Sequence, residues 1–151
     1  MKHKAITLLE LIIVVSIFML MVTAAMPRLV TGLYANQIEV AGQELVHVLR
    51  VAQSNSMDSF QDSSWGVYFD SAQYVLFVGD SYALRDTSKD LNYPLPGSVS
   101  FGALSLNGGG SEVVFAEASG MTSQYGTIDL DSASDPTQTV TVTRFGHVQK
   151  D

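Results

Sequence analysis

The chain has 151 residues, a formal net charge of −7 and no cysteine. Its length allows one ordinary domain plus an anchor, and the lack of cysteine excludes disulfides and thiolate metal sites. The whole net charge falls on residues 60–151, because residues 1–59 carry equal numbers of basic and acidic side chains. We expect no nucleic-acid partner, because nucleic-acid binding needs a cationic surface.

A long apolar run follows a short basic segment at the start of the chain. Lys2 and Lys4 precede the run, and no charged residue occurs from Leu11 to Met26. A helix of about 20 apolar residues crosses a bilayer core of roughly 30 Å. We therefore predict a transmembrane helix over residues 6–27, after a basic leader over residues 1–5.

The charge around this run predicts its orientation. Two lysines precede it and only Arg28 closely follows it, so the N-terminus is expected in the cytoplasm and the later residues outside. A buried core helix is one alternative, although the rest of the chain offers little mass to surround it. A secretory signal that is cut after Ala25 is another.

Glu10 lies inside the apolar run. A carboxylate in hydrocarbon costs roughly 2.5–3.5 kcal/mol on insertion scales, so it needs a partner. A chain cut just before Ile6 would place a new α-amino group about 6 Å from Glu10 along a helix. That amine, on the same chain or a neighbour, would neutralise the carboxylate. The alternative is that Glu10 reaches the membrane interface.

The sequence Ala5-Ile6-Thr7-Leu8-Leu9-Glu10-Leu11 after the basic leader resembles the class III signal of type IV pilins and type II secretion pseudopilins. In that family a membrane peptidase cuts after a small residue, usually Gly, and the fifth residue of the mature chain is Glu. Alignment on Glu10 implies cleavage between Ala5 and Ile6, and N-methylation of Ile6. This chain has Ala5 in place of the usual Gly and Ile6 in place of the usual Phe.

The specific resemblance covers about residues 2–28, and it includes Pro27, where many family members have a helix-kinking proline. Beyond these residues the chain has a looser likeness to the GspH/FimT-type minor pseudopilins. The resemblance implies a structural subunit that is processed by prepilin peptidase. Such a subunit waits in the inner membrane with its C-terminal domain in the periplasm, and then joins other pilin or pseudopilin subunits through Glu10.

Residues 28–58 are predicted to form the amphipathic half of the same helix. Apolar residues recur at spacings of three and four, which places them on one helix face. They are Val30, Leu33, Tyr34, Ile38, Ala41, Leu45, Val48, Leu49 and Ala52. We expect one helix from about Ile6 to about Met57, kinked at Pro27.

Residues 60–151 are predicted to form a periplasmic β-domain, because short β-branched and aromatic runs alternate with turn signals. In the run from Val99, we expect Val99, Phe101 and Ala103 to point the same way. Residues 81–96 are expected to be a surface loop, and residues 107–111 a turn. The expected strands are Trp65–Phe69, Tyr74–Val78, Val99–Leu106, Glu112–Ala116, Gly126–Leu130, Gln138–Phe145 and a short one near Val148. One long helix followed by antiparallel strands predicts an α+β fold with the sheet packed on the helix.

The sequence offers one candidate metal site and no catalytic constellation. Asp129, Asp131 and Asp135 alternate in a loop-like stretch, and such carboxylates suit Ca²⁺, although a solvated acidic turn is the alternative. No other cofactor is expected. His47 reads as a polar-face residue, and the chain has no nucleophile motif. We therefore expect a structural subunit and not an enzyme.

Two other functions remain open from the sequence. The chain could be a membrane-anchored binding module outside any fibre, with its ligand at residues 70–73, 81–96 or 129–135. It could also be a secreted enzyme with a cleaved signal, although the sequence lacks the residues for one.

Overall fold

A computed structural model describes residues 8–60, 63–132 and 136–151, without the side chains of residues 24–36. The chain divides into two compact units, Met1–Leu33 and Tyr34–Asp151. Helix α1, Leu8–Met57, begins in the first unit and ends in the second. The two units are described separately.

In the second unit, α1 buries one apolar face. The predicted spacing of three and four is confirmed from residue 38 onward, where the face lies against the sheets. Its buried residues are Ile38, Ala41, Leu45, Val46, Val48, Leu49 and Ala52. The side chains of Val30, Leu33 and Tyr34 lie outside the described residues.

The strands form two four-stranded antiparallel sheets rather than the one sheet expected. The first has the order β3-β2-β1-β5 and the second the order β4-β6-β7-β8. The first comprises β1 (Trp65–Asp70), β2 (Gln73–Val78), β3 (Leu91–Pro94) and β5 (Glu112–Phe115). The second comprises β4 (Val99–Leu106), β6 (Gly126–Ser132), β7 (Gln138–Val142) and β8 (Val148–Lys150).

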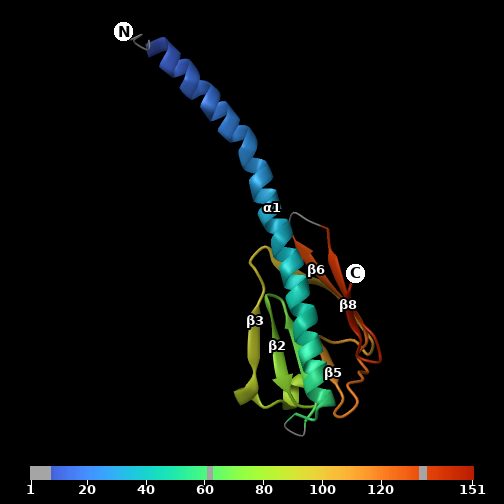
Figure 1. Cartoon of the computed structure of the whole chain (residues 1–151). Coiled ribbons are helices and arrows are strands. Elements are labelled where there is room, and N and C mark those ends of the chain that lie inside the picture. The colour runs from blue at the N-terminus through green and yellow to red at the C-terminus, as the bar shows by residue number, and fades with distance from the viewer. Residues whose placement is uncertain (1–7, 61–62, 133–135) are drawn as a thin grey trace. The chain divides into compact units, whose positions relative to one another are not determined.

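Both sheets contribute to one hydrophobic core under α1. Figure 1 shows the end of α1 in front of the sheets, with β2 and β3 to one side and β6 and β8 to the other. The inward residues of both sheets, such as Val67, Leu76, Ile128 and Val140, belong to the same cluster as Leu45. The predicted α+β fold, with a long helix packed on antiparallel strands, is confirmed.

The prediction of a plain surface loop over residues 81–96 is wrong. This segment contains two short 3-10 helices, η1 (Tyr82–Leu84) and η2 (Thr87–Lys89), and then β3. Strand β3 pairs with β2, and the rings of Tyr93 and Tyr74 stack with their centroids 5.2 Å apart. Because β3 is short, mostly exposed and ends in proline, it lacks the apolar alternation that marks a strand.

The segment before β3 covers the outer face of the first sheet. The ring of Tyr82 stacks on Tyr68 at 3.8 Å and meets Phe77 edge-on at 5.6 Å. The Arg85 guanidinium lies 3.6 Å from the centre of the Tyr82 ring and pairs with Asp90 at 2.8 Å. These contacts explain why β2 is buried on both of its faces.

The expected facing of β4 is wrong in its second half. Phe101 pairs with Leu130 and Leu104 pairs with Ile128, so two residues of β4 lie opposite one residue of β6. This bulge shifts the alternation by one residue. Ala103 is consequently exposed, whereas Leu104 packs against the core and Leu106 is buried.

Candidate functional site

The predicted cleavage and methylation site, Ala5 and Ile6, lies outside the described residues. Glu10 lies in the first turn of α1 as described. Around it, the large apolar side chains between Leu8 and Val22 are 45–79% exposed. A helix that is apolar on all sides is normally surrounded by lipid or by other helices, and no such surroundings exist among the described residues of this unit.

A separate observation bears on the predicted transmembrane helix. Over the described residues, no helix reaches the combined length and hydropathy that a membrane crossing needs. The backbone of α1 stays helical through Pro27, whose side chain lies outside the described residues. The kink at Pro27 therefore stays a prediction.

The candidate metal ligands Asp129 and Asp131 lie on β6, and Asp135 lies outside the described residues. Asp129 accepts a hydrogen bond from Thr139 at 2.7 Å, and Asp131 accepts one from Thr137 at 2.7 Å. These bonds join β6 to β7 and to the residue just before β7. Within residues 8–60, 63–132 and 136–151, no group of three or more His, Asp or Glu side chains is placed to hold a metal ion. The Ca²⁺ site stays a prediction, because one of its three ligands is not described.

A polar network joins α1 to the closing strand of the second sheet. The Glu39 carboxylate pairs with the Lys150 ammonium and accepts hydrogen bonds from Gln138 at 2.8 Å and Gln43 at 2.7 Å. The Lys150 hydrogen bond, followed by those from Gln138 and Gln43, lowers the pKa of Glu39 to about 2. Together these groups fasten β7 and β8 to one turn of α1.

A second contact strengthens the same junction. Arg50 donates to the backbone oxygen of Val148 at 2.8 Å. The sequence analysis missed both Glu39 and Arg50 as junction residues, because their partners lie 98–111 positions away. The only signal in the sequence is that Glu39 and Arg50 both lie on the polar side of an amphipathic helix.

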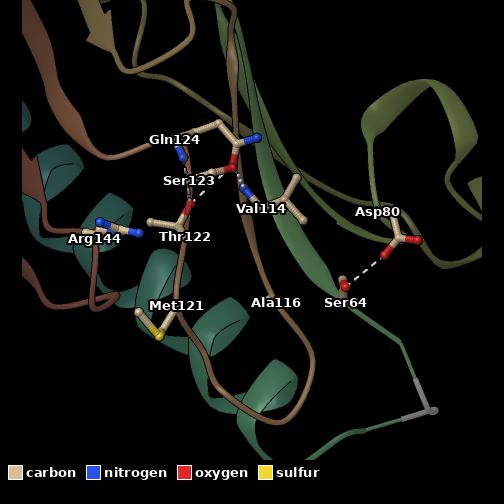
Figure 2. A pocket seen from close by; sticks show the side chains of 9 residues that line it. All are labelled: Ser64, Asp80, Val114, Ala116, Met121, Thr122, Ser123, Gln124 and Arg144. Carbon is tan, nitrogen blue, oxygen red and sulfur yellow. Dashed lines mark hydrogen bonds between the residues drawn. The ribbon is translucent and has the colours of Figure 1, made fainter.

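A pocket of about 390 Å³ lies beside β5, outside all of the predicted ligand loops. Figure 2 shows Arg144 and Met121 on one side, and Ser64 bonded to Asp80 on the other. The Gln124 side-chain oxygen accepts from the Val114 backbone at 3.4 Å and from the Thr122 hydroxyl at 3.2 Å. The lining residues are Ser64, Asp80, Val114, Ala116, Met121, Thr122, Ser123, Gln124 and Arg144.

Comparison with known proteins rests on the fold. No protein-family model matches the chain, and no curated protein sequence matches it. One solved structure of the minor pseudopilin EpsH, from the type 2 secretion system of Vibrio cholerae, superposes with a TM-score of 0.57 at 11% identity. It covers 76% of this chain and 95% of its own.

A second crystal structure of EpsH from the same organism gives a TM-score of 0.55 at 12% identity. That match covers 76% of this chain and 93% of the EpsH chain. At such low identity the likeness concerns the path of the chain and not individual side chains. The chain therefore has a pseudopilin-like fold.

Proposed function

We propose that this protein is a structural subunit, a minor pseudopilin or minor pilin, of a type II secretion pseudopilus or a type IV pilus. The observation that carries the proposal is the exposed apolar surface of α1 between Leu8 and Val22, with Glu10 in its first turn. A pseudopilin-like fold in the rest of the chain supports the same function. The subunit has no catalytic role in this proposal.

In this proposal the apolar run of residues 6–27 holds the precursor in the inner membrane, with the N-terminus in the cytoplasm and the domain in the periplasm. Prepilin peptidase cuts between Ala5 and Ile6, and Ile6 is methylated. The new amine of one subunit pairs with Glu10 of a neighbour, which fixes the axial register of the fibre. In the fibre the apolar helices then surround each other, which covers the exposed surface of Leu8 to Val22.

Processing can be tested directly at the N-terminus. The intact mass of the protein from cells with prepilin peptidase should correspond to a methylated chain that begins at Ile6. Cells without the peptidase should yield a chain that keeps residues 1–5. A chain that begins at Met26 in both strains would identify a secretory signal and contradict the fibre proposal.

The pairing of Glu10 is tested by Glu10→Ala. Removal of the carboxylate should leave membrane insertion intact or improve it, because an ionised side chain is costly in hydrocarbon. Incorporation into the fibre, measured by co-purification with other pilin-like subunits, should fall strongly. Ser16→Ala is the matched control, because within the described part of the chain the Ser16 hydroxyl donates to the Ile12 carbonyl of its own helix, at 2.7 Å, and to no other group. Normal incorporation of Glu10→Ala would contradict the pairing.

A further inference from the structure

Arg144 differs from the other cations of the domain. In the part of the chain that the structure describes, each other Lys or Arg from residue 34 onward binds a carboxylate or a backbone oxygen. These cations are Arg50, Arg85, Lys89 and Lys150. Arg144 has no ion pair or side-chain hydrogen bond among the described residues, and it lines the pocket beside β5 with its side chain exposed. Because Arg144 has no partner among the described residues, its guanidinium is available to a group from outside. The domain around it is strongly acidic.

Two neutral donors lie in the same pocket. The side-chain oxygen of Gln124 is occupied by Val114 and Thr122, which leaves its amide N–H₂ group free to donate. The Ser123 hydroxyl makes no hydrogen bond within the described residues, and its side chain is exposed. The Arg144 guanidinium is the donor of this pocket that suits a carboxylate best, because hydrogen bonds between charged groups are the stronger ones.

The opposite wall limits the charge of the ligand. Asp80 lies there and accepts a hydrogen bond from the Ser64 hydroxyl at 2.9 Å, as Figure 2 shows. A second acidic group of a ligand would meet this carboxylate and be repelled. The pocket therefore favours one carboxylate over a cluster of them.

One apolar side chain, Met121, lines the pocket beside the donors, and a second, Phe145, follows Arg144 in the sequence. Met121 lines the pocket at 38% exposure, and Phe145, next to Arg144, is 74% exposed. The backbone fixes their positions, because the Thr122 N–H donates to the Arg144 carbonyl at 3.1 Å. Arginine, methionine and aromatic side chains together are the composition that protein interfaces favour.

We propose that this pocket binds one acidic side chain of a different protein. Arg144 pairs with the carboxylate. Met121 contacts an apolar residue next to the acid. This inference goes beyond the proposed function and does not depend on it, because it concerns residues of the second unit only.

The test uses the full chain in detergent micelles, labelled with ¹⁵N-arginine. The probes are the peptides acetyl-Leu-Asp-Leu-amide and acetyl-Leu-Asn-Leu-amide, titrated at neutral pH. The acidic peptide should shift the side-chain signal of Arg144 and bind about two- to fivefold more tightly than the neutral one, the range for one exposed ion pair. The signal of Arg85 should not move, because Asp90 already holds that guanidinium.

Variants that change the charge of single residues distinguish binding at Arg144 from nonspecific electrostatic attraction. Arg144→Gln should abolish the preference for the acidic peptide, and Arg144→Glu should prefer the corresponding lysine peptide. Asp80→Asn should bind the acidic peptide more tightly, because the opposing charge is gone. Lys89→Gln is the control: it removes an exposed cation that pairs with Asp86 at 3.6 Å, and it should leave the preference unchanged.

Three outcomes would overturn the proposal. The first is equal binding of the two peptides, and the second is an unchanged preference in Arg144→Gln. The third is an Arg144 signal that shifts with the concentration of the protein alone, which would identify the occupant as a second copy of this chain. Because cleavage of the leader does not enter this experiment, its failure would leave the proposed function standing.

Discussion

Ser59 follows the last turn of α1 in a backbone conformation that glycine adopts more readily. Its φ is +48°, in the left-handed region. The Phe60 N–H donates to the Asn55 carbonyl at 2.8 Å, and the Ser59 N–H donates to the Ser56 carbonyl at 3.2 Å. These two bonds form the Schellman arrangement in which C′ is usually glycine. The position therefore carries the strain of a non-glycine residue.

We expect Ser59→Gly to raise the free energy of unfolding by about 0.5–1 kcal/mol, because the released strain exceeds the added entropy of the unfolded chain. Ser59→Val should lower it, since a β-branched residue fits positive φ poorly. Urea denaturation followed by circular dichroism measures both. Equal stability of the two variants would show that φ at residue 59 does not matter.

Because of Glu39, we expect the stability of the domain to depend on pH in the acidic range. Its pKa is about 2 when folded against an ordinary value of 4.5. A lowered carboxyl pKa contributes stability above the unfolded value, and this contribution is lost as the pH falls from about 4.5 to about 2. The difference in Tm between the wild type and Glu39→Gln should therefore be largest near neutral pH and vanish near pH 2.

The comparison needs a control on the same helix. Glu44→Gln removes a carboxylate with no side-chain hydrogen bond or ion pair among the described residues. The Tm of Glu44→Gln should change with pH in the same way as the Tm of the wild type. Because Glu39 is exposed to solvent, added salt should shrink its effect. A Glu39→Gln curve parallel to the wild type down to pH 2 would contradict the network.

At the scale of elements, the sequence predicted most strands from alternation alone. The hairpin of β1 and β2 pairs Asp70 with Gln73, the first and last of the four residues between the two predicted strands. The turn before the predicted short strand near Val148 needs glycine, because Gly146 has a φ of +81° and a Cβ there would lie 2.2 Å from the Gly120 oxygen. Local patterns sufficed in both cases, because turn chemistry is local.

The elements that sequence reasoning missed depend on distant partners. Strand β3 is identified by its pairing with β2 and not by its composition. The bulge in β4 follows from its register with β6, and the Glu39 junction follows from residues about a hundred positions away. The pocket at Arg144 assembles from separate loops for the same reason.

Gly66 allows β1 to pack closely on its neighbours. A Cβ there would lie 2.6 Å from the Phe77 ring and 2.9 Å from the Val113 carbonyl oxygen. We expect Gly66→Ala to destabilise the protein by about 1–3 kcal/mol, as overpacking does. Phe77→Leu in the same chain should recover part of the loss, because the ring is relieved while the carbonyl contact remains.

The control for this prediction is Gly97→Ala, where a Cβ would meet nothing within 4 Å. That variant should unfold at the same urea concentration as the wild type. Full recovery in the double variant would mean that the Val113 carbonyl moves aside freely. No loss in Gly66→Ala itself would contradict the close packing.

At the scale of the whole molecule, stability should reside in the second unit. The described core residues all lie from Ile38 onward. We expect a fragment of residues 34–151 to fold by itself and to unfold in urea at nearly the same midpoint as the full chain in micelles. Loss of cooperative unfolding in the fragment would show that the first unit contributes to the core.

The junction of α1 with β8 affects the order in which the domain matures during synthesis. The ribosome makes the helix early, yet Arg50 and Glu39 find their partners only when Val148 and Lys150 have emerged. A nascent chain therefore lacks the Arg50 and Glu39 contacts until about a hundred further residues have been made. At roughly 5–20 residues per second, this is an interval of several seconds.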